Sequence, residues 1–358
     1  MKNVITAAFV VFALLCATSV SIAQETSCIG LYSIADTLYK QGKWSAACQV
    51  GRQALDKAKT SGTPYQPTAI KTMVLLADLK RDLGQPADAR ILTSAAHDAS
   101  TARFGPNHPY TMKTLIRSAE LAERRSDGET AKKLYGRAIS ASREGGDDVT
   151  VAPALIGMAG ICRKEGRADE AEALYKRALE VYETARKYRP YLDGNIAQIR
   201  CDIAGINRER DNYAEASENY RKSLAKCNLV YGSHSMNAAD TRVRLGDAYM
   251  GWGKPARAER QYRKALAAYQ RLSGANDIKT ALILKRLGDL YLAKNNFPKA
   301  ERSYTQAVAV LKKCSPTCSA TLTSAMKALD DLRMKRGDRA EAPLHQSVSG
   351  QFSTGPAV

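Results

Sequence analysis

Small and apolar residues recur along this chain with a period of about 42 residues. The most regular marker is an alanine that returns at steps of 42, 42, 40, 45, 42 and 42 residues: Ala47, Ala89, Ala131, Ala171, Ala216, Ala258 and Ala300. A small residue lies twelve positions before and another seven positions after each of these alanines. A tyrosine follows the last five by four positions, and offsets of three and four place such residues on one side of a helix. The pattern therefore predicts one structural unit copied seven times.

A turn signal divides nearly every unit just before its alanine. These signals are Gly42-Lys43, Gly84-Gln85, Gly166-Arg167, Asp211-Asn212, Gly253-Lys254 and Asn295-Asn296. Glycine and asparagine at such positions end helices, so each unit is predicted to be a helix, a tight turn and a second helix. Small residues at facing positions let the two helices approach closely, and the tyrosine ring fills the wedge toward the next unit.

Two of the units resemble the tetratricopeptide repeat signature. The residues that carry the resemblance are Leu287-Gly288, Tyr291, Phe297, Ala300, Tyr304 and Ala307, and also Leu245-Gly246, Tyr249, Ala258, Tyr262 and Ala265. The usual repeat has about 34 residues. The longer unit here is similar to the kinesin light chain variety, whose linking loop the segment Phe104–Thr111 also resembles.

The resemblance covers about residues 28 to 313. It implies an all-α, right-handed superhelical solenoid of about seven tetratricopeptide-type helix-turn-helix repeats. After it, Leu322, Met326, Leu329 and Arg333 have helical spacing within residues 319–336, which predicts a C-terminal capping helix over the open end of the stack.

The two ends of the chain differ from the repeats. Residues 1–23 combine Lys2, an apolar run and the small residues Ser21 and Ala23, which predicts a signal peptide; the alternative is an uncleaved membrane anchor. The solenoid with its capping helix is expected over residues 24–336, and residues 337–358 are expected to form a disordered tail. The protein is thus expected to be exported, to the periplasm, the cell surface or the medium.

The charge balance narrows the choice of partner. The chain has 54 basic and 36 acidic residues and a net charge of +18. A basic protein favours acidic partners, either an acidic peptide or protein segment or a negative membrane surface, and export argues against nucleic acid. The alternative is that these charges only solvate the outer face.

Seven cysteines remain after the predicted signal peptide, so at least one thiol is free or pairs between chains. Cys314 and Cys318 lie close together just beyond the last repeat, and in an oxidising compartment they are candidates for a local disulfide.

The sequence contains no catalytic motif. A glycine-rich phosphate loop, a Gly-x-Ser-x-Gly elbow, a His-Glu-x-x-His pair and a Cys-x-x-Cys pair are all missing from it. We therefore expect no enzyme activity, no cofactor and no metal site.

The resemblance also implies where a ligand would bind. In the family, the first helices of successive repeats line a concave groove. The basic residues expected to face this groove are Lys113, Arg117, Arg163, Lys164, Arg208, Arg244, Lys285 and Arg286. Arginine binds carboxylates bidentately, so these residues are candidates for binding an extended acidic peptide; the alternative is that each is solvated or paired within the chain.

Two classes of function remain open. The first is an exported scaffold that binds a peptide or protein segment in its groove. The second is a structural or assembly component of an envelope or secretion complex, acting through self-association or edge docking. The sequence leaves the oligomeric state unknown.

Overall fold

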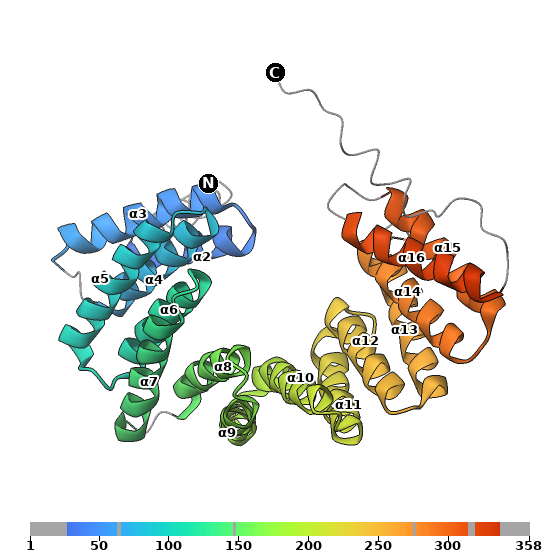
Figure 1. Cartoon of the computed structure of the whole chain (residues 1–358). Helices are drawn as coiled ribbons and strands as arrows, with labels where there is room; N and C mark the ends of the chain where they lie inside the picture. Colours follow the sequence, from blue (N-terminus) through green and yellow to red (C-terminus); the bar gives the residue numbers. More distant parts are fainter. Residues whose placement is uncertain (1–26, 63–65, 146–147, 275–276, 314–318, 337–358) are drawn as a thin grey trace, which may run out of the picture. The chain divides into compact units, whose positions relative to one another are not determined.

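A computed structural model of the chain describes residues 27–62, 66–145, 148–274, 277–313 and 319–336. Within these residues the chain forms fifteen α-helices and one 3-10 helix, and no strand (Figure 1). The helices are α2 (Cys28–Lys40), α3 (Trp44–Thr60), α4 (Pro67–Asp82), α5 (Pro86–Phe104), α6 (Pro109–Arg124), α7 (Gly128–Gly145), α8 (Asp148–Lys164), α9 (Ala168–Arg186), η1 (Pro190–Leu192), α10 (Asp193–Glu209), α11 (Tyr213–Tyr231), α12 (Met236–Gly251), α13 (Pro255–Ser273), α14 (Ile278–Ala293), α15 (Phe297–Lys313) and α16 (Ser319–Arg336).

The chain divides into two compact units, residues 1–181 and 182–358. In the N-terminal unit α2 pairs with α3, α4 with α5 and α6 with α7, and α8 is followed by most of α9. In the C-terminal unit α10 pairs with α11, α12 with α13 and α14 with α15, and α16 packs against α15. The predicted all-α class with repeated helix pairs is confirmed.

The residues of the repeat pattern form the seams between helices. All seven alanines of the 42-residue pattern are fully buried. The tyrosines that follow them at the fourth position, Tyr135, Tyr175, Tyr220, Tyr262 and Tyr304, are buried as well. Small side chains at the closest approach and large rings beside them account for the regular packing of helix on helix.

The tight turns form where the sequence predicts them. Gly42, Gly84, Gly166 and Gly253 have φ values between 68° and 78°, and Asp211 and Asn295 have φ values of 59° and 55°. This left-handed conformation is easy for glycine and tolerable for asparagine and aspartate, so it ends the first helix of these six repeats. In the third repeat Ser126 adopts it, with a φ of 61°.

Two glycines permit a closer contact than alanine would. A Cβ atom on Gly246 would lie 2.4 Å from Cε1 of Tyr262, whose ring crosses the glycine. The Tyr262 hydroxyl then donates a hydrogen bond to the neighbouring Asp247 at 2.7 Å. The next repeat repeats this contact with Gly288, Tyr304 and Asp289, also at 2.7 Å. The glycine therefore lets the tyrosine reach the carboxylate that follows it.

The predicted capping helix is α16. Leu322, Met326, Leu329 and Leu332 are buried on one side of it, against the last helix pair. Arg333, which shares the predicted spacing, lies half-buried with its Nε 3.8 Å from Glu301. The helix therefore covers the end of the apolar core of the C-terminal unit.

Several predicted features lie outside the described residues. These are the signal peptide (1–23), the tail (337–358) and the candidate disulfide between Cys314 and Cys318. The cysteines at 28, 48, 162, 201 and 227 are free thiols. Among the helices that the structure describes, none has the length and apolarity to cross a bilayer.

Candidate functional site

The first helices of the repeats carry the predicted binding residues. They are α2, α4, α6 and α8 in the N-terminal unit and α10, α12 and α14 in the C-terminal unit. One position after the small residue of the repeat, five of these helices carry an acid: Asp36, Asp78, Glu120, Asp247 and Asp289. We call these five residues the acidic row. In α8 and α10 the row is interrupted by Gly160 and Gly205.

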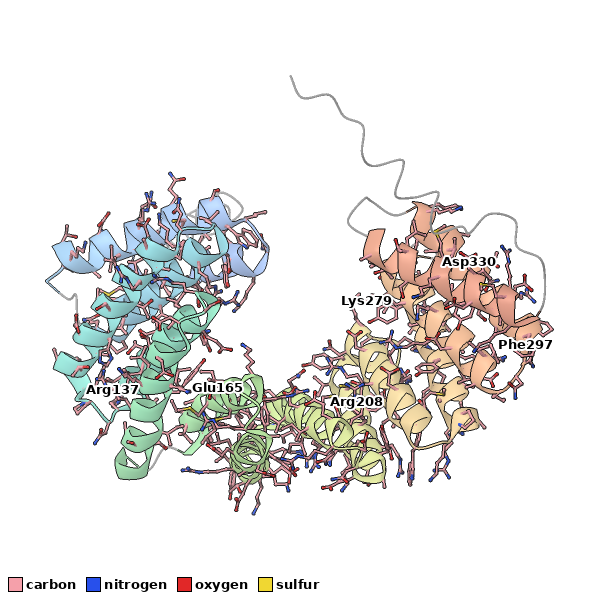
Figure 2. All side chains as sticks on the ribbon, viewed as in Figure 1. Arg137, Glu165, Arg208, Lys279, Phe297 and Asp330 are labelled. Atoms are coloured by element: carbon pink, nitrogen blue, oxygen red, sulfur yellow. The ribbon has the colours of Figure 1, made fainter. Side chains whose placement is uncertain are left out.

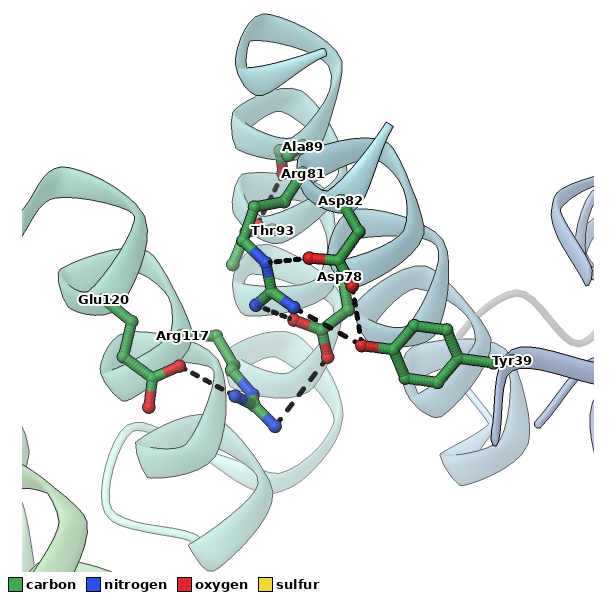
Figure 3. Close-up of polar contacts among 8 residues, drawn as sticks. All are labelled: Tyr39, Asp78, Arg81, Asp82, Ala89, Thr93, Arg117 and Glu120. Carbon is green, nitrogen blue, oxygen red and sulfur yellow. Dashed lines mark hydrogen bonds and ion pairs between the residues drawn. The ribbon is translucent and has the colours of Figure 1, made fainter. Parts of the chain in front are cut away.

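In the N-terminal unit two members of the acidic row, Asp78 and Glu120, bind arginines of the same chain (Figure 3). Arg117 donates to Glu120 at 2.7 Å on its own helix, and its other terminal nitrogen lies 3.7 Å from Asp78 on α4. Arg81 also donates to Asp78, at 2.6 Å. Of the two readings of Arg117 that the sequence leaves open, the structure places this side chain in ion pairs within the chain.

The same network continues to α2. Arg81 donates through Nε to Asp82 at 2.8 Å, and the Tyr39 hydroxyl donates to the same carboxylate at 2.9 Å. The hydrogen bond from Arg81 is the main cause that lowers the pKa of Asp82, and the bond from Tyr39 adds to it, against a smaller opposing effect of burial. Burial raises the pKa of Asp78, although Arg117 and Arg81 oppose this rise.

These opposite shifts predict how stability depends on pH. The folded protein holds Asp82 ionised, so its contribution is fully present above the unfolded pKa of about 4 and is lost as the pH falls through the lower folded value. We expect Asp82→Asn to lower the free energy of unfolding by about 1 kcal/mol at pH 7 and by less at pH 3. Urea unfolding at both pH values measures this difference.

The exposed Asp56 of α3, which forms no ion pair with a described residue, provides the control Asp56→Asn. An Asp82→Asn loss that is equal at the two pH values would contradict the role assigned to the Asp82 carboxylate.

In the C-terminal unit two predicted cations are also paired. Arg286 on α14 donates through Nε to Asp247 on α12 at 2.9 Å. Lys285 donates to Asp289, one turn further along its own helix, at 3.3 Å. Burial, together with the Asp247 carboxylate, raises the pKa of Tyr262 well above its usual range, so this hydroxyl stays a donor.

The other predicted residues of the N-terminal unit have different surroundings. Lys164, at the end of α8, donates to Glu123 of α6 at 2.7 Å but remains 70% exposed, and Arg163 beside it is half-buried. Lys113 is exposed, and its ammonium lies 5.6 Å from the centre of the Tyr110 ring. Lys71 of α4 approaches the same ring at 5.7 Å. Two cations from neighbouring repeats therefore approach the Tyr110 ring.

The remaining two arginines lie where the acidic row is interrupted in the C-terminal unit. Arg208 projects from α10, one turn after Gly205, and its buried Nε has no hydrogen-bond partner among the described residues (Figure 2). Arg244, exposed on α12, likewise forms no ion pair with a carboxylate of the described chain. Burial raises the pKa of Tyr220, and the positive charges of Arg208 and Arg244 oppose that rise.

A cavity of about 330 Å³ adjoins Arg244. Its walls come from the first halves of α10 and α12 and the last half of α11, and its lining includes Asn195, Gln198, Cys201, Ser223, Cys227, Asn237, Asp240, Thr241 and Arg244. We call it the α10–α12 cavity. Asn195 and Asn237 are exposed at its rim and occupy the same position of successive repeats, 42 residues apart. Sequence reasoning missed these two residues, although their spacing was the available signal.

Thiol and hydroxyl groups that contact one another form the buried part of the cavity wall. The Cys201 thiol lies 3.1 Å from the Ser223 hydroxyl and 3.8 Å from Thr241, and Cys227 lies 3.7 Å from the same Thr241 oxygen. Burial raises the pKa of the Cys201 thiol. In the part of the chain that the structure describes, no three His, Cys, Asp or Glu residues come together as a group that could hold a metal ion.

Comparisons with known proteins agree on the repeat. The sequence model of the tetratricopeptide repeat matches residues 110–184, 195–271 and 253–313, which together make up more than half of the chain. No curated protein matches the sequence.

Three solved structures illustrate the likeness. The BtubC (BKLC) protein of P. vanneervenii is 21% identical with a TM-score of 0.53, over 69% of this chain and 95% of that one. The apo form of RapI is 14% identical with a TM-score of 0.68, over 91% and 85%. A Rap protein complexed with competence and sporulation factor is 16% identical with a TM-score of 0.50, over 80% and 75%. At these identities the likeness concerns the fold alone.

Proposed function

Because this chain belongs to the tetratricopeptide repeat family, we propose that it is a binding scaffold that takes up an acidic segment of a peptide or protein on the first helices of its C-terminal unit. The residues that would hold the segment are Arg244, Asn195 and Asn237, which line one cavity, and Arg208 near the other end of α10.

The observation that carries this proposal is the pair of arginines beside the interrupted acidic row. In the neighbouring repeats, Asp247 and Asp289 neutralise Arg286 and Lys285. At Gly205 the chain supplies no such carboxylate, and the Nε of Arg208 is buried without a partner among the described residues. A buried donor left unsatisfied destabilises a protein by about 1–3 kcal/mol. Because Nε has no exposed surface, an incoming carboxylate would relieve this penalty by drawing the Arg208 side chain outward. Guanidinium groups bind carboxylates through two parallel hydrogen bonds.

The α10–α12 cavity provides the neighbouring contacts. Its volume of about 330 Å³ is at the lower end for small-ligand sites, so it suits a side chain or a short stretch of an extended segment. The exposed amides of Asn195 and Asn237 can each donate to and accept from the backbone of such a segment. The site therefore combines charge recognition with sequence-independent backbone contacts.

The proposed acidity of the partner has further support in the charge of the chain. A net charge of +18 attracts negatively charged segments over the distance set by ionic screening. Among the similar structures, a Rap protein was crystallised in complex with competence and sporulation factor, so a fold of this kind carries a bound partner there. We propose a binding role without catalysis for the present chain.

The test is a pair of substitutions on the full chain. We expect Arg208→Ala with Arg244→Ala to weaken binding of a fluorescent acetyl-hexaglutamate peptide by about tenfold or more at low salt, since each removes a charged hydrogen-bond donor. Fluorescence anisotropy at two salt concentrations measures the effect, and the wild type should lose more affinity in high salt than the double variant.

A matched control removes the same charge elsewhere. Lys264→Ala with Arg271→Ala, two exposed residues of α13, should bind the peptide nearly as the wild type does. Equal binding by the Arg208/Arg244 variant and this control would leave only a general charge effect and would contradict the proposed site.

We also propose that the protein acts outside the cytoplasm, after removal of residues 1–23. The support is the sequence of this segment, with one basic residue, an apolar run and small residues before Gln24. Protein that retains Met1 and stays in the cytoplasmic fraction would contradict this.

A further inference from the structure

A second cavity of the C-terminal unit is lined by arginines. It has a volume of about 650 Å³ and is formed by Arg221 of α11, Tyr249 of α12, and Ala256, Arg257 and Arg260 of α13. We call it the arginine cavity. No residue of its lining is acidic, and none belongs to the α10–α12 cavity.

The three arginines have little neutralisation within the chain. Arg221 donates to Glu218 at 2.7 Å, and the carboxylate of Glu218 also lies 3.7 Å from Lys222. Arg257 lies over the Tyr249 ring, 5.9 Å from its centre. Neither Arg257 nor Arg260 forms an ion pair with a carboxylate in the described part of the chain. Like charges gathered in one depression repel each other unless an anion joins them.

Arg257 is a cation at the third position of its helix, as Lys299 is in α15. It lies in the first turn of α13, where the helix dipole disfavours a cation. At the same position α5, α9 and α11 carry Asp88, Glu170 and Glu215, the favourable type of residue. A local rule broken in this way is typical of sites kept for binding rather than for stability.

The next repeat has related residues at the equivalent positions, and there a carboxylate of the chain itself lies among them. Moving each lining residue forward by 42 positions gives Arg263, Tyr291, Pro298, Lys299 and Arg302. Among them lies Glu259, which accepts from the Tyr291 hydroxyl at 2.9 Å. Arg263 lies 3.0 Å and Lys294 3.4 Å from the same carboxylate.

The Glu259 carboxylate is held in its charged form. Partial burial by itself would raise its pKa, but the hydrogen bonds from Tyr291 and Lys294 and the charge of Arg263 lower the pKa overall. Tyr291, Arg263 and Lys294 therefore form an anion site that the Glu259 carboxylate occupies.

The residue at the Glu259 position, one repeat earlier, is Ser217. Its hydroxyl is buried and donates to the carbonyl of Ala214 at 2.9 Å. Tyr249 forms no hydrogen bond through its hydroxyl to a described residue, in contrast to Tyr291. This repeat keeps the tyrosine and the arginine, as Tyr249 and Arg221, but has Trp252 at the position of Lys294 and lacks the carboxylate of Glu259.

We propose that the arginine cavity binds a carboxylate from outside the chain, supplied by an acidic side chain of a protein partner. The incoming group occupies the place that the Glu259 side chain occupies one repeat later, beside Arg221 and the Tyr249 hydroxyl, while Arg257 lies over the Tyr249 ring. The arginine cavity is separate from the site of Arg208 and Arg244 proposed above. This inference holds whether or not that site binds a partner.

The test exchanges the two residues at this position. It uses the full chain carrying Arg208→Ala and Arg244→Ala, so that the site of these two arginines does not contribute to binding. The probe is acetyl-hexaglutamate. Ser217→Glu supplies the missing carboxylate within the chain and should reduce binding by about tenfold. Glu259→Ser should have the opposite effect and add a second site, seen by isothermal titration calorimetry as a rise in stoichiometry.

Further variants keep the test independent of folding. Arg260→Ala removes an exposed side chain and should weaken binding, whereas Arg271→Ala, with the same loss of charge, should not. Binding that is unchanged in both Ser217→Glu and Arg260→Ala would overturn the proposal. Inorganic phosphate serves as a competitor: if it displaces nothing, a carboxylate preference is supported, and if phosphate binds tightly while hexaglutamate does not, the assignment to an acidic side chain is wrong.

Discussion

Tyr262→Ala is expected to lower the free energy of unfolding by about 3–5 kcal/mol, the largest effect of any single substitution considered for this chain. The Tyr262 side chain is 2% exposed and lies across Gly246 at the seam between α12 and α13. Its removal leaves a cavity that the rigid helix pair fills only in part, and it takes away one of the two partners of Asp247. Urea unfolding followed by far-ultraviolet circular dichroism measures the loss.

Two comparisons separate the parts of this effect. Tyr262→Phe keeps the ring and removes only the hydroxyl, so it should lose about 1 kcal/mol because Arg286 still neutralises Asp247. Tyr188→Ala removes a tyrosine that is 80% exposed and should change stability by less than about 0.5 kcal/mol. A Tyr262→Ala protein as stable as the Tyr188→Ala protein would contradict the role of this ring in the repeat seam.

Gly246→Ala is expected to destabilise the protein by about 1–3 kcal/mol, although the same exchange inside a helix normally stabilises. The new Cβ would lie 2.4 Å from Cε1 and 2.7 Å from Cδ1 of Tyr262, closer than such atoms approach. Either the ring moves and its hydroxyl leaves Asp247, or the two helices separate. Chemical denaturation gives the size of the loss, and the crystal structure of the variant shows which of the two occurs.

The matched control is Gly136→Ala on α7. A Cβ atom on Gly136 meets no other atom within 4 Å, so only helix propensity acts there, and the substitution should stabilise by up to about 1 kcal/mol. The two glycine-to-alanine exchanges should therefore have opposite signs. A gain of stability at Gly246 would show that the close contact with Tyr262 has no energetic importance.

The repeats of this chain serve as controls for one another. Gly246 and Gly288 accompany Asp247 and Asp289, and in both cases the tyrosine of the following helix donates to the aspartate. In α10 the equivalent residues are Ala204 and Gly205, and Arg208 lies there with a buried nitrogen that no described residue satisfies. Ser217 and Glu259 likewise occupy equivalent positions of two successive repeats. In both comparisons the proposed binding site lies in the repeat that lacks the carboxylate.

The 42-residue period was sufficient to predict the helix pairs, their turns and their buried seams. Burial of Ala258 and Tyr262 follows from helical periodicity, and the turn at Gly253 follows from the conformational freedom of glycine, which are both local properties. The family resemblance added which helices carry the candidate binding residues. It named Arg208 and Arg244 together with Arg117 and Arg286. The sequence did not show which of these arginines pair with carboxylates of the chain.

Only the tertiary structure separated them. Arg117 and Arg286 form ion pairs with Asp78 and Asp247, which lie on the preceding first helix some forty residues earlier in the chain. Such contacts depend on how two helices cross and which rotamers the crossing allows, and a periodic pattern of residue types contains neither quantity. Arg221, Tyr249 and Arg257 line one cavity for the same reason, because three helices meet there. The sequence by itself determined where the chain is helical and buried, whereas the packed helices decided which charges remain available to a partner.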